Sequence, residues 1–550
     1  MSEETLARLP SSESAWSPLK QPLFRNRLIA SVLSNVGSWM QDTGATWLMT
    51  SLTRSPLLIA LMQTAASLPV LLVGLPAGAT ADILDRRKLL IFWQSWMLAI
   101  AAVLAVLSFL GIIGSWMLLL LTLLLNIGAA MNNPAWQAIV PELVSRAELP
   151  QAISLNSAGY NLARAVGPAL GGITVAFFAS AMKGGGTVFA VNAASFVFVI
   201  FVLYAWKRKP LHTSDLPAER MMGSMRAGLR YVLHAPDILR ILVRAFLMTS
   251  CVAAMWALLA VVARQDMKAG ALGYGLLNGC IGVGAVVGAI LLPHVRSRFS
   301  SDQIVIVASV AFAGVLVVMA LAHQMRFVVP ALLVGGFAWT STTSTFNIAV
   351  QLSAPAWVQA RLLGSYQMVF QAGMAIGSAI WGLLAEKIGT PVALCIAAAG
   401  LLVGLPLARR FPVPSGRIAD LSRARGLNRS DPTVLIELRP EDGPVLIAIE
   451  YQIDPARAKE FIQALQCLRP VRLRDGAMRW ALYHDAANPQ RYVENFLVES
   501  WAEYLRQRER LTMNDAEMLE KVRSFQKGEH PPLVSRMIYT PVESASRAQY

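Results

Sequence analysis

Twelve apolar stretches, each long enough to cross a lipid bilayer as a helix, constrain this chain more than any other feature. A hydrocarbon core about 30 Å thick requires roughly 20 apolar residues in helical form, because no water satisfies the backbone there. We predict a first set of helices near 27–50, 57–79, 89–112, 116–136, 153–181 and 187–206. A second set follows near 239–262, 272–293, 304–322, 327–349, 364–387 and 391–408. The sequence therefore predicts an all-α polytopic membrane protein built as two six-helix halves.

Composition separates this membrane part from a second, more polar part. Hydrophobic residues make up 55% of the 550, and the mean hydropathy is +0.50, which is too apolar for an ordinary soluble globule. Beyond about residue 410, Arg, Glu and Asp become frequent. We expect an N-terminal tail (1–22), a first six-helix half (23–206) and an inter-half loop (207–238). A second six-helix half (239–410), a linker (411–431) and a soluble domain (432–540) follow.

The net charge of +15 reflects membrane topology rather than nucleic-acid binding. The chain has no basic-aromatic motif that reads nucleic acid, and its Lys and Arg concentrate in alternate short loops, which marks the cytoplasmic side. These residues include Arg25, Arg27, Arg86, Arg87, Lys88, Arg146, Lys207, Arg208, Lys209, Arg296, Arg298, Arg361, Arg409 and Arg410. We expect a multi-pass protein of the inner membrane, surrounded by lipid, with both termini cytoplasmic and no nucleic-acid partner.

An internal repeat supports the division into halves. The pattern N-x-A-x-Q-x-x-x-P follows the fourth predicted helix and recurs after the tenth, as Asn133, Ala135, Gln137, Pro141 and then Asn347, Ala349, Gln351, Pro355. A duplicated six-helix half would place both copies at corresponding helix ends. Between the halves, AERMMGSMRAGLRYVL (218–233) predicts an amphipathic helix.

The loop GATADILDRRKLL, between the second and third predicted helices, is a candidate conformational latch. Glycine lets helix ends approach closely, a carboxylate accepts hydrogen bonds from a helix N-terminus, and arginines bind carboxylates bidentately. The candidate gating residues are Gly78, Asp82, Asp85, Arg86, Arg87 and Lys88. A solvated, positively charged loop is the alternative interpretation. The corresponding loop of the second half, LLPHVRSRFSSD, has Pro293 and His294 but no clear Asp, so we expect a degenerate second latch.

The fifth predicted helix, NSAGYNLARAVGPALGG, combines small residues with a buried charge. Glycine permits close backbone contact in lipid, and proline bends a helix and frees a carbonyl, so Gly167, Pro168, Gly171 and Gly172 predict a pliable interface helix. Ordinary small-residue packing is the alternative. Arg164 lies one turn earlier, where a charge is costly unless it is paired or faces a wet cavity.

We expect Arg164 to bind a substrate or a coupling carboxylate, with Asn156 and Asn161 on the same face; snorkelling to the membrane surface is the alternative. In the first predicted helix, Asn35 and Asp42 are further candidates. A buried carboxylate exchanges protons readily, so Asp42 is a candidate proton carrier, and an exposed helix cap is its alternative role.

These motifs resemble those of the major facilitator superfamily. The pattern G-x-x-x-D-x-x-x-R-R-K is similar to its signature loop, with Asp85 where Gly is usual, and G-P-x-x-G-G is similar to its antiporter motif, with Ala163 at the leading Gly. The amino-acid sequence of residues 20–410, including NPAWQAIVPELV, resembles the enterobactin-exporter-like branch of this superfamily, whose members are also called transmembrane secretion effectors. The resemblance implies proton-coupled efflux of a small amphipathic molecule, siderophore-like or drug-like, by alternating access. The direction of transport is not fixed by these motifs, so import is an alternative. The fourth predicted helix lacks the Arg that many drug exporters of this superfamily carry there.

The C-terminal part predicts a strand, a helix, two strands, two helices and a strand between residues 445 and 539. This order resembles the ferredoxin-like dimeric barrel of antibiotic-biosynthesis monooxygenases, which implies self-association. A pocket lined by Trp480, Tyr483, His484, Glu499 and Trp501 is one interpretation, and a packing or dimer surface is the favoured one.

No cofactor or metal spacing occurs in the sequence, so we expect a transporter and not an enzyme. The alternative is a membrane-tethered monooxygenase-like or ligand-sensing protein that acts through its C-terminal domain. Removal of residues 432–550 would separate the two, since only the transporter would stay active.

Overall fold

The computed structural model describes residues 16–145, 148–206, 221–355, 357–406, 410–413, 436–528 and 530–540. The predicted cytoplasmic positions of five basic residues concern the part of the chain outside these ranges: Arg146, Lys207, Arg208, Lys209 and Arg409. The chain divides into two compact units. The helical unit comprises Met1–Asp215, Leu242–Phe346 and Tyr366–Pro412, and the mixed unit comprises Leu216–Ile241, Asn347–Ser365 and Val413–Tyr550.

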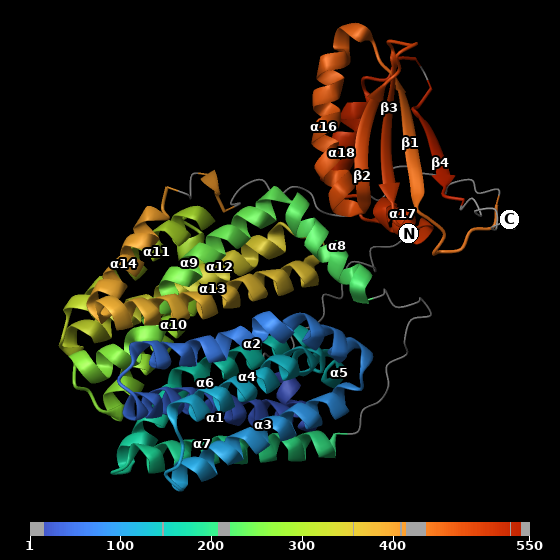
Figure 1. Ribbon diagram of the computed structural model, residues 1–550. Helices are drawn as coiled ribbons and strands as arrows, with labels where there is room; N and C mark the ends of the chain where they lie inside the picture. The colour runs from blue at the N-terminus through green and yellow to red at the C-terminus, as the bar shows by residue number, and fades with distance from the viewer. Residues whose placement is uncertain are drawn as a thin grey trace, which may run out of the picture. The chain divides into compact units, whose positions relative to one another are not determined.

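Each of the twelve predicted apolar ranges coincides with a helix (Figure 1). The first six are α1 (Pro22–Leu52), α2 (Pro56–Ile83), α3 (Arg86–Phe109), α4 (Ser115–Ala138), α6 (Leu149–Phe177) and α7 (Ala181–Ala205). The second six are α9 (Pro236–Val261), α10 (Ala271–Arg296), α11 (Ser301–Leu321), α12 (Met325–Leu352), α13 (Gln359–Ile388) and α14 (Thr390–Val403). Shorter pieces are η2 (Ser17–Lys20), α5 (Val140–Leu143) and η3 (Val262–Asp266).

Within the described residues, nine helices are long and apolar enough to cross a membrane. Neither α1 nor α6 is among them, although both have sufficient length, and α14 is short. The polar residues Asn35 and Asp42 lie in α1, and Asn156, Asn161 and Arg164 lie in α6. The two long helices that fall below the hydropathy criterion are therefore the two that hold the predicted polar site.

Packing inside the helical unit brings α6 against helices of both halves. It lies against α1, and it also packs along α10. Elsewhere in the unit α3 packs on α7, α2 on α4, and α11 on α14. The α6–α10 contact therefore joins the first set of helices to the second.

The internal repeat has the same local structure in its two copies. The side-chain amide of Gln137 donates to the Asn133 side-chain oxygen over 3.2 Å, one residue before α4 ends. Gln351 donates in the same way to Asn347, one residue before α12 ends. The matched hydrogen bond at matched helix ends supports a duplicated half.

A four-stranded antiparallel sheet forms the centre of the mixed unit. Its strands are β1 (Val445–Gln452), β2 (Ala477–His484), β3 (Arg491–Val498) and β4 (Leu533–Ile538), in the order β2-β3-β1-β4. The helices are α16 (Ala458–Asp475), α17 (Trp501–Glu509) and α18 (Met513–Arg523), with the short η4 (Pro455–Arg457) before α16. The predicted alternation of strands and helices is confirmed, and only α16 runs clearly further than expected, past Pro470.

One face of this sheet carries the core of the mixed unit. Alternate residues of β1 point to this face: Tyr451 and Ile449 pack with Phe461 and Leu465 of α16, and Ile447 packs in a neighbouring cluster with Phe496. Figure 1 shows α16 and α18 on this side of the sheet. The predicted amphipathic helix is also present, as α8 (Met221–His234), and it packs on α16 within the same unit.

Candidate functional site

Arg164 of α6 lies between two tryptophans that belong to opposite halves. Its guanidinium carbon is 5.8 Å from the ring centroid of Trp39 on α1 and 5.9 Å from that of Trp339 on α12. Among the described residues no carboxylate forms an ion pair with it. A guanidinium held against aromatic faces keeps its N–H donors available at its edges. The arrangement therefore presents an unpaired cation inside the helical unit.

Tyr160 of α6 packs against the same tryptophan as Arg164. Its ring lies edge-on to Trp39 with centroids 6.3 Å apart. Asp42 lies on α1, which packs against α6 and also contacts α10 of the second half. Because α1 continues to Leu52, Asp42 lies inside the helix, and its alternative role as a helix cap is wrong. Its side chain has exposed surface.

The aromatic surroundings of Arg164 extend into the second half. Trp339 packs against Trp256 of α9, with centroids 4.3 Å apart, and against Phe370 of α13, with centroids 5.2 Å apart. Tyr366 follows at 5.9 Å from Phe370. Sequence reasoning missed this cluster, because the aromatic residues come from three separate helices and no spacing connects them.

The predicted asparagines do not join Arg164 through hydrogen bonds. Asn156 accepts a hydrogen bond from Arg27 of α1 over 3.4 Å, and Arg27 also lies over the Trp136 ring at 4.6 Å. Asn161 donates to the Ser157 carbonyl of its own helix, and Asn35 donates to Ser31. Neither amide bonds to Arg164 in this structure, and the expectation that the two residues share its face stays a prediction.

The glycines of the G-P-x-x-G-G motif lie where helices touch. A Cβ at Gly171 would come within 2.7 Å of the Met40 carbonyl of α1, and one at Gly172 within 2.8 Å of the Gly275 Cα of α10. Gly167 is similarly close to Trp39. Pro168 leaves the Arg164 carbonyl without its helical donor, and a Cβ at Gly282 of α10 would lie 2.8 Å from that oxygen. The motif thus forms a close contact between the halves.

A second contact between halves lies at the start of α2. Glu386, near the end of α13, accepts hydrogen bonds from the Ser55 hydroxyl and from the Leu57 backbone N–H, the latter over 3.2 Å. A carboxylate at a helix N-terminus is favoured by the helix dipole. Arg264, close to the end of α9, donates to Thr50 over 2.9 Å at the same end of the unit. The halves are therefore bridged at the end that holds Ser55.

The latch loop has a different geometry from the one expected at Gly78. A Cβ there would meet no atom of the described residues within 4 Å, so the expected close approach of described helix ends at this glycine is wrong. Asp85 is the N-cap of α3 and accepts from the backbone N–H of Lys88 over 3.0 Å. Lys88 itself is exposed. The side chain of Asp82 lies outside the described part of the structure.

Arg86 and Arg87 bind the ends of neighbouring helices. Arg86 donates to the carbonyls of Ala81 over 3.3 Å and Ala138 over 3.2 Å, at the ends of α2 and α4. Arg87 donates to the carbonyls of Leu203 and Tyr204 near the end of α7, over 2.9 and 2.7 Å. Cations are favoured at helix C-termini, where carbonyls have no helical partner. The loop therefore ties together the ends of three helices.

The second half contains an ion pair that the sequence did not suggest. Arg244 of α9 is in ionic contact with Asp302, in the first turn of α11, and donates to the Phe411 carbonyl over 3.4 Å. The loop has Pro293 and His294 where the first half has an acidic residue, as expected for a degenerate latch, and Asp302 follows the loop. The acidic residue was visible in LLPHVRSRFSSD, but its arginine partner is 58 residues away along the chain.

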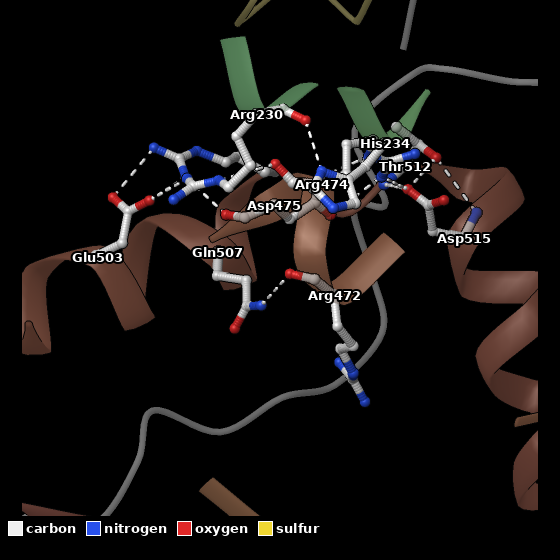
Figure 2. A network of polar contacts seen from close by, with 10 residues as sticks. Arg230, His234, Arg472, Arg474, Asp475, Glu503, Gln507, Thr512 and Asp515 are labelled. Carbon is white, nitrogen blue, oxygen red and sulfur yellow. Dashed lines mark hydrogen bonds and ion pairs between the residues drawn. The ribbon is translucent and has the colours of Figure 1, made fainter. Parts of the chain in front are cut away.

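Within the mixed unit, an ionic network joins α8 to the domain that carries the sheet (Figure 2). Arg230 of α8 binds Glu503 of α17 over 2.8 Å, and Glu503 also binds Arg510 over 2.6 Å. Both side chains of the first pair are largely buried. Arg474 binds Asp475 and Asp515 over 2.7 and 2.6 Å. Burial raises the pKa of the Asp475 carboxyl, and the contact with Arg474 opposes that shift.

The residues proposed for a C-terminal pocket do not form one together. Trp480 donates to the buried Glu494, and Trp501 packs in the core against Tyr504. His484 stacks on Tyr492 near the surface, and Tyr483 is exposed. The cavity of this domain is lined by other residues. Its walls come from six elements, which no sequence spacing connects.

The fold of the helical part is that of a polytopic membrane transporter. A bacterial homologue of the human lysosomal transporter Spinster, in an inward-facing and unoccupied conformation, superposes with a TM-score of 0.58 over 73% of this chain and 98% of that chain. The nucleoside transporter NupG superposes with a TM-score of 0.57 over 71% of this chain and 98% of that chain. They are 12% and 13% identical to this chain in sequence, so these likenesses concern the fold alone.

The family described as transmembrane secretion effector matches residues 13–544, and the chain belongs to this family. An MFS-type transporter of Bacillus subtilis is 26% identical over 69% of this chain and 92% of its own length. The enterobactin exporter EntS of Citrobacter koseri is 25% identical over 72% and 95%, and the staphyloferrin A transporter of Staphylococcus aureus is 23% identical over 66% and 89%. The chain is thus a multi-pass membrane transporter of the major facilitator type, and its relatives are transporters rather than enzymes.

Proposed function

We propose that this protein exports a small amphipathic molecule with an anionic or polar group, by proton-coupled alternating access. The observation that carries the proposal is Arg164, a cation without a carboxylate partner among the described residues, between Trp39 of one half and Trp339 of the other. Aromatic faces receive an apolar body, and the guanidinium binds a carboxylate or catecholate oxygen. Relatives named for enterobactin export, staphyloferrin A transport and multidrug efflux support a siderophore-like or drug-like substrate.

The same proposal includes twelve spans in the inner membrane, with both termini cytoplasmic. The helices at all twelve predicted ranges and the basic loops on one side support it. In this arrangement the Ser55–Glu386 bridge closes the outer end, while the loop containing Arg86 and Arg87 lies on the inner side. Rocking of the halves would proceed along the glycine contact between α6 and α10.

Asp42 is the proposed proton carrier. Its side chain has exposed surface, and its helix α1 packs against α6 of the first half and contacts α10 of the second, so a change in its charge acts where the two halves meet. Protonation would remove a charge that otherwise costs energy in the membrane, and would thereby favour rearrangement of the halves.

Uptake into inverted membrane vesicles tests the proposal, with catecholate siderophores and cationic dyes compared with and without a proton gradient. We expect gradient-dependent accumulation by the parent, and gradient-independent residual uptake by an Asp42→Asn variant inserted at the parental level. Accumulation only in vesicles of the opposite orientation would instead identify an importer. Equal gradient dependence in parent and variant would exclude Asp42 as the proton carrier.

The C-terminal domain is proposed to be ferredoxin-like and to self-associate. Its strand order β2-β3-β1-β4 supports the fold, and the sheet face opposite the core supports the association. That face presents Leu533 at 63% exposure and Met537 at 53%. A second copy would cover these side chains. Cross-linking of the full chain should detect dimers that a Met537→Glu variant loses, while dimers that persist in the variant would exclude this surface.

A further inference from the structure

A cavity of about 230 Å³ lies in the mixed unit between the sheet and its helices. Part of its lining is apolar, here called the apolar floor, and includes the side chains of Ile447, Ile449, Phe496 and Leu519. The volume is somewhat below the roughly 300–1,000 Å³ of pockets for drug-sized molecules. Its size therefore suits a small apolar group such as one ring system.

Four arginines line this cavity, against one carboxylate. They are Arg472, Arg508, Arg523 and Arg536, and the carboxylate is Asp475. Two of these charges are neutralised within the domain. Arg472 binds Glu494 through two hydrogen bonds of 3.0 and 3.2 Å, and Asp475 binds Arg474, which does not line the cavity, over 2.7 and 3.0 Å.

Of the three other lining arginines, Arg508 makes a further interaction, and Arg523 and Arg536 are the positive charges beside the apolar floor. Arg523 lies in the last turn of α18 and forms no ion pair with any residue the structure describes. Arg536 on β4 donates to the Tyr504 hydroxyl over 2.6 Å and to the Val534 carbonyl over 3.5 Å, which are neutral partners. Both side chains are exposed, so they stand at the solvent side of the cavity.

We propose that this cavity binds a small organic anion, with its apolar body on the floor and its carboxylate between Arg523 and Arg536. A cation would meet net positive charge there, and a neutral polar molecule would leave the apolar floor without a partner. The proposal goes beyond transport through the helical unit, and it does not depend on the direction of transport or on its coupling ion.

The cavity wall also belongs to the network that reaches α8. Gln507, which lines the cavity, donates to the Arg472 carbonyl over 3.3 Å. The backbone carbonyl of Asp475, another lining residue, accepts from Arg510 over 2.7 Å. Arg510 in turn binds Glu503, the partner of Arg230 (Figure 2). A ligand in this cavity would thus contact residues that are hydrogen-bonded to the network of Arg510, Glu503 and Arg230, and this network attaches α8 to the sheet domain.

Binding is measured on the full chain in nanodiscs, by saturation-transfer NMR with 2-naphthoate and its neutral isostere 2-naphthamide. The parent should bind 2-naphthoate, and the amide should bind at least about tenfold more weakly, because it cannot form charge-assisted hydrogen bonds. An Arg523→Gln/Arg536→Gln double variant should lose about the same factor for 2-naphthoate. Arg469→Gln/Arg479→Gln is the matched control, since both residues are exposed and neither lines the cavity.

A Val534→Phe variant separates the apolar floor from the charges. It fills the cavity while leaving both arginines in place, and it should weaken 2-naphthoate binding without removing a cation. The proposal is overturned if the parent does not bind 2-naphthoate, if the amide binds as tightly, or if the Arg523/Arg536 variant binds like the control. Thermal unfolding of each variant confirms that the domain is folded.

The anion could be a free metabolite or a lipid headgroup, and the nanodisc composition distinguishes these sources. If anionic phosphatidylglycerol occupies the cavity, 2-naphthoate binding should be weaker in phosphatidylglycerol than in phosphatidylcholine discs, and the difference should vanish in the Arg523/Arg536 variant. Equal binding of the parent in the two compositions would assign the site to a soluble anion.

Discussion

At the scale of the residue, function rests on where single charges lack partners. Arg164 has aromatic rings from both halves around it and no described carboxylate. We predict that Arg164→Gln lowers the initial rate of gradient-driven export at least about tenfold, because a charge-assisted contact to substrate is lost. Arg164→Lys should recover only part of the rate, since an ammonium lacks the planar fork. Radiolabelled substrate uptake into inverted vesicles measures both.

Arg326→Gln is the control for this prediction. Arg326 also lies over an aromatic ring, that of Phe327, at 4.8 Å, but at the start of α12. Its loss should leave transport near the parental rate. Parental transport by Arg164→Gln would show that the guanidinium has only a packing role.

At the scale of the element, helix contacts depend on the absence of single side-chain atoms. Gly172 of α6 approaches Gly275 of α10 so closely that a Cβ would lie 2.8 Å from its Cα, whereas Gly78 has open space. We predict that Gly172→Ala costs about 1–3 kcal/mol through overpacking and reduces transport, whereas Gly78→Ala does neither. Thermal unfolding in detergent together with vesicle transport checks this. A Gly78→Ala protein as damaged as Gly172→Ala would contradict the packing argument.

The bridge between α2 and α13 gives a second prediction at this scale. Replacing Glu386 by Gln leaves a hydrogen-bond acceptor for the Ser55 hydroxyl but removes the charge at the start of α2. We expect this end of the helical unit to open more often. Labelling of a cysteine introduced at Leu57 with a membrane-impermeant maleimide should therefore speed up severalfold.

A Lys387→Gln variant is the control for that measurement, because Lys387 is the exposed neighbour of Glu386. Equal labelling rates in the Glu386→Gln protein and in this control would show that the carboxylate does not hold the halves together.

At the scale of the whole molecule, one largely buried ion pair attaches the sheet domain to α8. The Arg230 and Glu503 side chains are 19% and 13% exposed, whereas those of Arg226 and Glu499, another α8 pair, are 71% and 61% exposed. Removing one partner of a buried pair leaves the other charge uncompensated, and exposed pairs contribute little. We predict that Arg230→Gln increases hydrogen exchange of the Met221–His234 backbone, and that the matched Arg226→Gln leaves it unchanged. Equal exchange in the two variants would contradict this role for the pair.

The sequence alone predicted the elements, because their signals are local. Apolar length placed a helix at each of twelve ranges, and alternation and turn residues placed four strands and three helices in the C-terminal domain. It also pointed to Arg164 and Asp42, since a charge in an apolar segment is visible without a fold.

Only the tertiary structure decided what those charges meet. Trp39 and Trp339 lie on helices from opposite halves, and Arg244 reaches Asp302 across 58 positions. Arg523 of α18 and Arg536 of β4 line one cavity. Gly78 and Gly172 are the same residue type in the sequence, yet among the described residues only Gly172 of the two lies against another helix. Contacts between distant segments depend on how helices and strands pack, and that information is spread over the whole chain rather than held in any one motif.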